Sequence, residues 1–410
     1  MALNFFNQYR GLRKELYIIF WGRVVTAMGA LIGPMLTLIL KSKLGYTASE
    51  VANLMLIIGL IQLPCVLIGG KLADKFNKKY IIVICDMVTV IGYLLCAFLP
   101  MQRFLIVIFS ISGIFAQMES PSYDALIANM STQEERSRAY SLNYMGANLG
   151  FILAPTLGGL LFENHLNLAF LFSSIATFSS TVLIFFFIKD TAPSNDDSEA
   201  GSYEQESKAT LREIFSCTPV LMIFLVSIGI TGSLYHIGNG FMMPLTLESV
   251  FSAKGALIFG TLCSFNGVVV IIGTPICTSL FSGIHDTGKL IMGEAMQMAG
   301  FWIFMLSGRN IFMYYISMAV FTIGEILNTL GSKPYITSRV PASHRGRASS
   351  VITVCSDLFK GVCLYFVGLL ADKFSISYIW TGIILLGIIN LLGLSFLRKK
   401  DKEQFPLLYR

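Results

Sequence analysis

The sequence predicts an all-α membrane protein, with twelve transmembrane helices arranged as two pseudo-symmetric six-helix halves. Of its 410 residues, 54% are hydrophobic and only 13% are charged, a composition that excludes a soluble globular domain. Apolar runs of about 20 residues, long enough to cross a hydrocarbon core of about 30 Å as a helix, recur along the chain. Landmarks of the first half also return at a nearly constant distance in the second half.

Six apolar runs precede a polar segment and six follow it. They cover residues 16–40, 49–70, 80–99, 103–127, 138–162, 168–188, 214–248, 255–282, 289–307, 311–334, 346–371 and 376–397. The polar segment at 189–213 lacks apolar periodicity and is rich in acidic residues, which predicts a flexible linker. The expected domains are therefore a six-helix bundle at 1–188, a cytoplasmic linker at 189–213, and a second six-helix bundle with a short cytoplasmic tail at 214–410.

The basic residues predict which side of the membrane each loop faces. Lys and Arg are retained on the cytoplasmic side, so the short loop at 70–80, which holds four lysines, is expected there. With the N-terminus also inside, 22 basic residues fall in the predicted cytoplasmic segments and six in the external loops. This asymmetry favours a multi-pass protein of the plasma membrane with both termini in the cytoplasm.

An internal repeat relates the two halves at spacings of 209 or 210 residues. Three pairs of residues in matching local sequences mark it: Pro34 and Pro244, Arg138 and Arg347, and Gly159 and Gly368. Two parallel halves related by an axis along the membrane normal leave such a repeat in the sequence. In transporters built this way, the substrate site lies between the halves near the midplane of the membrane.

The loop at 70–80 carries the most specific motif. It reads Gly-Lys-Leu-Ala-Asp-Lys-Phe-Asn-Lys-Lys-Tyr and resembles, nearly residue for residue, the signature between helices 2 and 3 of the major facilitator superfamily. Asn77 stands where the family usually has Gly, and Asn tolerates the left-handed backbone that we expect at this turn. The resemblance implies the superfamily fold and transport by alternating access.

The same resemblance implies a set of gating residues: Gly70, Asp74, Lys75, Lys78, Lys79 and Asp124. In the family, the aspartate of the signature meets the N-terminal end of helix 11, and its basic residue pairs with an acidic residue at the cytoplasmic end of helix 4. Asp74, Lys78 and Asp124 match these positions, and the contact is expected to latch the outward-open state. For the exposed lysines, solvated charges that only orient the loop are the alternative.

Ionisable side chains inside predicted spans are costly and are functional candidates by default. At ~1.5 Å per residue, Arg23 on helix 1 and Glu119 on helix 4 both lie ~10 to 12 Å from the cytoplasmic end, so we expect that they can pair. In the superfamily fold, helices 1 and 4 line the central cavity, which implies a role in binding substrate or protons. A purely structural ion pair is the alternative.

Glu325 on helix 10 is the third candidate for substrate or proton coupling. No basic residue lies within a helical turn of it, and a low dielectric disfavours the charged form of such a carboxyl group. The Gly324-Glu325 pair resembles the lactococcal-type multidrug exporters of the superfamily, in which the matching glutamate faces the drug cavity. A protonated glutamic acid that is hydrogen-bonded across the bundle is the alternative.

We expect the other ionisable residues inside the predicted spans to have structural roles and not to take part in transport. Asp357 and Lys360 are three residues apart on helix 11 and are expected to neutralise each other. Asp86 and Glu294 lie on helices 3 and 9, which are peripheral in this fold, and we expect snorkelling or local pairing near the cytoplasmic interface.

Helix 5 carries the signal that indicates a transport direction. Its sequence resembles the glycine-proline signature that marks drug:proton antiporters of the superfamily, with matches at Gly150, Pro155, Gly158 and Gly159. Close helix packing at small residues, with a bend at the proline, is the plainer interpretation. The arginine that such antiporters often carry in the middle of helix 4 is missing, since Phe109 or Ser110 occupies that region.

These observations predict a secondary transporter that exchanges protons for amphiphilic or drug-like compounds and exports them. A metabolite or lipid facilitator or symporter and a non-transporting membrane sensor are the alternatives. We expect no enzymatic activity, cofactor, metal or nucleic-acid partner, and a monomer, because the sequence shows no phosphate-binding loop, nucleophile-base arrangement or metal-ligand spacing. The eight cysteines are interpreted as small buried residues.

Overall fold

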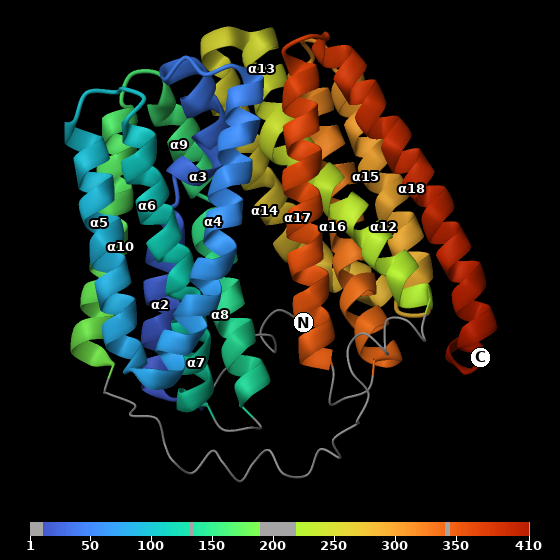
Figure 1. The fold of residues 1–410 in the computed structure, drawn as a ribbon, viewed down its shortest axis with the longest axis horizontal. Coiled ribbons are helices and arrows are strands. Elements are labelled where there is room, and N and C mark those ends of the chain that lie inside the picture. Colours follow the sequence, from blue (N-terminus) through green and yellow to red (C-terminus); the bar gives the residue numbers. More distant parts are fainter. Residues whose placement is uncertain (1–10, 132–134, 189–218, 341–344, 410) are drawn as a thin grey trace. The chain divides into compact units, whose positions relative to one another are not determined.

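The computed structural model is helical throughout the residues that it describes, which are 11–131, 135–188, 219–340 and 345–409 (Figure 1). The predicted all-α fold is therefore confirmed for these residues. The predicted linker at 189–213 lies outside them.

The helices of the first predicted half coincide with its six apolar runs. They are α2 (Lys14–Met28), α3 (Ile32–Leu38) and the π-helical turn η1 (Ile39–Lys43), then α4 (Ala48–Lys75), α5 (Lys78–Phe98), α6 (Leu105–Met118), α7 (Ser120–Met130), α8 (Arg136–Phe151), α9 (Ala154–Phe162) and α10 (Leu166–Phe187). Three runs are therefore divided into consecutive helices rather than forming one rod.

The second half follows the same plan. Its elements are α12 (Pro219–Tyr235), η3 (His236–Met242), α13 (Met243–Phe251), the short turn η4 (Ser252–Lys254), α14 (Gly255–Leu280), α15 (Asp286–Leu306), α16 (Ile311–Arg339), α17 (Arg345–Ala371), α18 (Ile376–Gln404) and η6 (Pro406–Tyr409).

Ten segments of the described chain are long and apolar enough to cross a membrane. One of them, Pro219–Leu280, extends over 62 residues and includes α12, α13 and α14. Helix α15 is not among the ten, because Lys289, Glu294 and Gln297 lower its hydropathy. Polar residues inside an otherwise apolar helix are the first indication that α15 has a buried polar contact.

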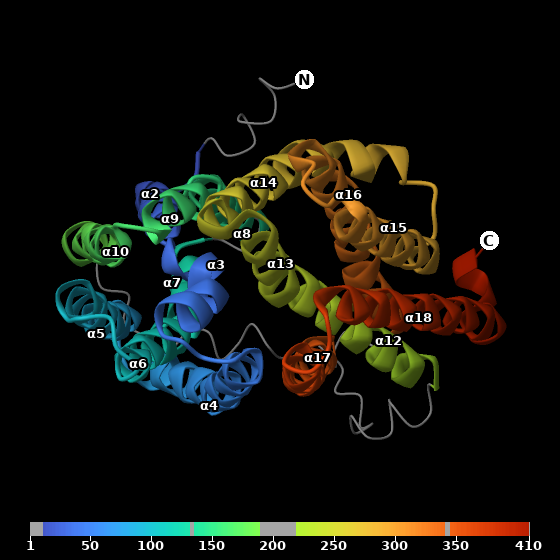
Figure 2. The ribbon, with the colours of Figure 1, turned by 90° about the horizontal axis from the view of Figure 1, so that it is seen from above.

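The helices form two compact units whose boundaries differ from the predicted domains. The first unit contains most of the N-terminal helices together with residues 253–267, and the second contains the remaining C-terminal helices together with residues 46–56. The start of α14 thus belongs with the first unit and the start of α4 with the second. Figure 2 shows α5, α6 and α10 of the first unit nearly end-on.

Each unit has its own apolar core. In the first, Ile19 on α2, Ile82 on α5, Leu126 on α7 and Ile184 on α10 are at most 1% exposed and belong to one cluster. In the second, aliphatic and aromatic side chains of α12, α15, α16 and α18 form the corresponding cluster. These cores fix the helices that carry the buried polar groups described next.

Candidate functional site

The first unit contains a buried pair of carboxyl groups. Asp86 on α5 is 3% exposed, and Glu119, at the junction of α6 and α7, is 7% exposed. The two carboxyl groups lie close enough to interact electrostatically. The Thr181 hydroxyl on α10 donates a hydrogen bond to Asp86 Oδ2 at 2.7 Å. Three helical segments that are distant in the sequence thus converge on one acidic pair.

Burial favours one bound proton on this pair, because like charges on two neighbouring carboxyl groups repel strongly in a low dielectric. A hydrogen bond between Asp86 and Glu119 would form only with one of them protonated, since two carboxylates are both acceptors. Glu119 Oε2 is buried without a hydrogen-bond partner, which leaves one acceptor of the pair unsatisfied.

Arg23 on α2 lies within electrostatic range of both carboxyl groups. It forms no ion pair with Glu119 within 4.0 Å, so the predicted direct pairing is not present in this structure. Its Nε atom is buried and has no hydrogen-bond partner. A second carboxyl group, that of Asp86, lies near Glu119 instead. For Asp86 we expected snorkelling or local pairing, and the structure shows local pairing with Thr181 at 3% exposure.

The second unit contains a buried carboxyl group in a neutral setting. Glu294 on α15 is 0% exposed. It accepts hydrogen bonds from the Thr231 hydroxyl on α12 at 2.7 Å and from Asn390 Nδ2 on α18 at 3.1 Å. Of the two alternatives expected for Glu294, the structure thus shows local pairing and not snorkelling.

The two buried acids are related by the internal repeat. Glu294 follows Asp86 by 208 residues, and Asn390 follows Thr181 by 209. In each unit, a carboxyl group on the third helix of a half is thus bonded to a polar side chain on the sixth. The sequence already contained this signal, since spacings of 208 and 209 residues lie within two residues of those of the landmark pairs.

The repeat also shows how the two sites differ. At a spacing of 209 residues, Gly232 takes the place of Arg23 and Asn328 takes the place of Glu119. Asn328 is 7% exposed, and neither polar atom of its side-chain amide has a hydrogen-bond partner. The site in the first unit is therefore charged, and its counterpart in the second unit combines one acid with neutral polar groups.

Glu325 on α16 accepts a hydrogen bond from another helix of the second unit. The Tyr235 hydroxyl on α12 donates to Glu325 Oε1 at 3.2 Å, and the Tyr235 ring stacks on Phe321 with centroids 5.4 Å apart. Thr231 and Tyr235 are four residues apart and so share a face of α12. One face of this helix thus contacts both Glu294 and Glu325.

The predicted pair on α17 is confirmed. Lys360 Nζ donates to Asp357 Oδ1 at 2.8 Å. The side chain of Lys360 is 34% exposed and that of Asp357 is 40% exposed. Such an exposed pair contributes little to stability. It neutralises two charges, as expected from the spacing.

The lysine-rich loop differs from two expectations. Asn77 has φ −63° and ψ 119°, and its side chain accepts a hydrogen bond from the Lys79 amide at 2.9 Å. The expectation of a left-handed turn was wrong: Asn77 is the N-cap of α5, a position that Asn favours. Lys78 is 7% exposed and forms no ion pair with Asp124 within 4.0 Å, so this part of the predicted gate is not assembled here.

The other predicted gating residues lie at the end of α4 or the start of α5. Lys75 is exposed, and Lys79 lies with its ammonium group 5.2 Å from the centre of the Phe185 ring. A Cβ atom placed on Gly70 would meet none of the described atoms within 4 Å. Asp74 lies at the end of α4.

The helix 5 signature forms a close-packed seam. Pro155 lies in the first turn of α9, directly after the break that ends α8, which confirms the predicted bend. A Cβ on Gly150 would lie 2.3 Å from Val24 O, one on Gly158 would lie 2.4 Å from Leu31 O, and one on Gly159 would lie 2.5 Å from Ala256 O. Only glycine permits these approaches, so the small-residue packing is confirmed.

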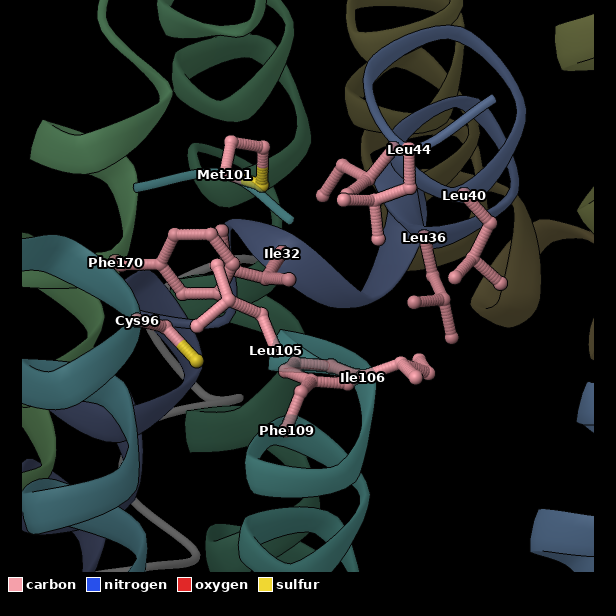
Figure 3. A pocket seen from close by; sticks show the side chains of 11 residues that line it. Ile32, Leu36, Leu40, Leu44, Cys96, Met101, Leu105, Ile106, Phe109 and Phe170 are labelled. Atoms are coloured by element: carbon pink, nitrogen blue, oxygen red, sulfur yellow. The ribbon is translucent and has the colours of Figure 1, made fainter. Parts of the chain in front are cut away.

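A separate pocket in the first unit has no polar lining. It is a small, partly open hollow lined by eleven hydrophobic side chains, including Leu36, Phe109 and Phe170 (Figure 3). Without a charge or hydrogen-bonding group it has no means to select an ion or to carry a proton. The buried acids and not this pocket are therefore the candidate coupling site.

Sequence comparison identifies the family. The sequence pattern of the Major Facilitator Superfamily matches residues 19–362 of the chain. The chain belongs to this superfamily. It is a secondary transporter and not an enzyme, with a multi-pass membrane fold.

Two proteins similar to this chain are named as an antiporter and as a resistance protein. One, a "Na(+), Li(+), K(+)/H(+) antiporter" of Planococcus maritimus, is 23% identical over 331 residues, which are 72% of this chain and 76% of the relative. The other, "Quinolone resistance protein NorA" of Staphylococcus aureus, is 26% identical over 261 residues, which are 61% of this chain. The match spans 65% of the length of NorA.

Solved structures of superfamily-type transporters share the fold. The peptide transporter POT in complex with sulfate has a TM-score of 0.77 at 14% identity, covering 97% of this chain and 96% of that one. The nucleoside transporter NupG has a TM-score of 0.74 at 12% identity, covering 94% and 100%. At these identities the likeness concerns the fold alone.

Two contacts that sequence reasoning missed lie at opposite ends of the second unit. The Arg339 guanidinium, 8% exposed, is bonded to Asp401, 0% exposed. Asp372, in the turn after α17, accepts hydrogen bonds from the first amides of α4. Both aspartates lie outside the central part of the apolar runs, so nothing in hydropathy alone distinguishes them from solvated charges.

Proposed function

We propose that the chain is a proton-coupled antiporter of the plasma membrane, which exports amphiphilic or drug-like small molecules by alternating access. The observation that carries this proposal is the buried carboxyl pair of Asp86 and Glu119 in the first unit, which would hold one proton in the membrane-spanning part of the protein. Ionisable groups at such depth are typical of proton pathways in transporters.

The charge of the cluster explains how a proton and a substrate would compete. With one shared proton, Asp86 and Glu119 carry one negative charge, and Arg23 compensates it. Loss of the proton leaves one uncompensated negative charge in a low dielectric, which favours the binding of a cationic or amphiphilic substrate. Return of the proton weakens that attraction and promotes release.

Two further observations support export of drug-like compounds. The glycine-proline seam of α8 and α9 matches the signature of drug:proton antiporters at Gly150, Pro155, Gly158 and Gly159. The name of the NorA relative refers to quinolone resistance. A proton-driven exporter accounts for both.

A second candidate function is the exchange of alkali cations for protons, which the Planococcus maritimus relative favours by its name. Carboxyl and amide oxygens are suitable ligands for small hard cations. The same deprotonated pair would then attract a metal ion instead of an organic cation. The two functions differ in substrate and not in the coupling residues.

The proposal is tested with Glu119→Gln and Asp86→Asn in purified, reconstituted protein. We expect dye transport driven by an imposed pH gradient to fall by at least about tenfold in both variants. With an amide in place of either carboxyl group, the pair can no longer share and exchange a proton. Glu403→Gln, at the exposed end of α18, is the matched control and should transport normally. Adding Na⁺, Li⁺ or K⁺ to the same vesicles, with an internal pH dye, separates the two functions. Wild-type rates in both variants would refute the role of the pair.

A further inference from the structure

A seven-residue motif of the lysine-rich loop occurs a second time in the chain. Residues 70–76 read Gly-Lys-Leu-Ala-Asp-Lys-Phe, and residues 368–374 read Gly-Leu-Leu-Ala-Asp-Lys-Phe, with six identical positions. The spacing is 298 residues, which differs from the 209 that relates the two halves. The second copy is therefore not a consequence of the internal repeat.

The two copies occupy equivalent places in the structure. The first ends α4 and precedes α5, and the second ends α17 and precedes α18. In the predicted topology, α4 runs into the cytoplasm and α17 runs out of it. The two motifs therefore lie at opposite ends of the molecule with respect to the membrane.

The second copy binds the start of α4, and both segments belong to the second compact unit. The first amides of any helix lack intrahelical partners. Thr47 and Glu50 satisfy one amide each through a capping box, with bonds of 2.8 Å and 3.2 Å. Asp372 satisfies the two amides between them: Ala48 N donates to Oδ1 at 2.9 Å and Ser49 N donates to Oδ2 at 3.1 Å.

The glycine of the second copy brings the two helices together. A Cβ on Gly368 would lie 2.3 Å from Ala52 Cβ and 3.0 Å from Ala48 O. A Cβ on Gly361, two helical turns earlier on the same face, would lie 2.6 Å from Leu56 Cδ1. Both residues of the motif, Gly368 and Asp372, thus depend on the close approach of α4 and α17.

We propose that Gly368 and Asp372 form an outer latch, which positions α4 against α17 and holds the external end of the transport path closed. The glycine permits the approach, and the aspartate ties down the helix start through its amides and their partial positive charge. The latch must open once per transport cycle, and in this respect alone it rests on the proposed function.

Asp372 remains ionised at physiological pH. Partial burial opposes ionisation, but the hydrogen bonds from Ser49 and Ala48 outweigh it and hold the pKa of Asp372 below its ordinary value. Ordinary aspartate has a pKa of about 4, so the carboxylate keeps its charge between about pH 5 and 8. The latch is thus opened by helix movement and not by external acid.

The test measures the distance between spin labels at Tyr46 and Tyr378, in a background without the eight native cysteines, and without substrate or a proton gradient. We expect Asp372→Asn to raise the ratio of long to short distances about 2- to 30-fold, the range for a charge at a helix N-terminus. Gly368→Leu should act in the same direction by steric separation. Asp372→Glu, which keeps the charge, should restore much of the short-distance population.

Lys373→Ala is the matched control, because it alters the next exposed charge without a contact to α4 and should leave the ratio unchanged. An Asp372→Asn distribution that coincides with wild type in correctly folded protein would overturn the latch. An equal effect of Lys373→Ala would also overturn it, since it would indicate a general effect of surface charge. Because no transport is measured, failure of the proposed antiport does not affect this result.

Discussion

At the scale of single residues, the neighbours of a buried acid determine what it does. Asp86 and Glu294 occupy repeat-equivalent positions and are equally buried. Asp86 lies near a second carboxyl group and within range of a guanidinium, which compensates one of the two negative charges that remain when the proton leaves. Glu294 has only hydroxyl and amide partners, and its ionised form would be an uncompensated charge.

We therefore predict that Glu294→Gln folds with nearly wild-type stability, because a neutral acid and an amide are similar in size and polarity. Glu294→Ala should be less stable by about 1–3 kcal/mol, since Thr231 and Asn390 lose a buried partner. Thermal unfolding of the purified proteins in detergent measures both. Equal destabilisation by Gln and Ala would mean that the charge itself is required.

At the scale of helices, Glu119 and the glycine seam at Pro155 lie where regular structure is interrupted. Glu119 is the residue between α6 and α7, and its backbone carbonyl accepts from the amides of Ser122 and Tyr123 at 2.8 Å and 3.2 Å. The break before Pro155 opens the glycine seam of α9 to α3 and α14. Such breaks aim side chains that a straight helix would direct elsewhere.

A buried ion pair joins the ends of α16 and α18. Arg339 Nε donates to Asp401 Oδ1 at 2.7 Å, and the Tyr335 hydroxyl donates to the same oxygen at 3.1 Å. The Arg339 guanidinium also lies over the Tyr335 ring, at 3.8 Å from its centre. These bonds make Asp401 a structural anchor of the second unit.

We predict that Asp401→Ala lowers the stability of the protein by about 3 kcal/mol, the low end for breaking a buried pair. The buried Arg339 charge then keeps only the more distant carboxylate of Asp286, at 3.7 Å. Glu403 lies two residues after Asp401 and forms an exposed ion pair with Lys400. Glu403→Ala should therefore leave the unfolding temperature unchanged. Thermal unfolding of the two variants side by side provides the comparison. Similar behaviour of both would contradict an anchoring role.

At the scale of the whole molecule, the basic residues predict the orientation in the membrane. We expect Lys75→Cys to react with a membrane-impermeant maleimide only after permeabilisation, and Lys373→Cys to react in intact cells, in a background without native cysteines. Both side chains are exposed, so accessibility depends on the side of the membrane. Labelling of position 75 from outside would reverse the topology and would move the proposed latch to the cytoplasmic face.

Much of the fold followed from the sequence because hydropathy and charge act locally. Each apolar run became a helix or a series of helices, the Asp357–Lys360 pair formed at its i,i+3 spacing, and Pro155 ended a helix. Burial of single acids did not follow, since the same Asp or Glu snorkels on a lipid-facing side and is buried on the opposite side. For Asp86 and Glu294 the sequence left snorkelling and local pairing open for this reason, and the structure shows local pairing.

By itself, the sequence determined that this chain is a helical membrane protein of the major facilitator superfamily, because about 20 apolar residues suffice to define a span and a motif requires no distant partner. Only the tertiary structure decided which polar groups meet: Glu119 with Asp86, Glu294 with Asn390, and Asp372 with the amides of α4. These contacts join residues that are 33, 96 and 324 positions apart. Their formation depends on helix packing, which composition and local spacing do not specify.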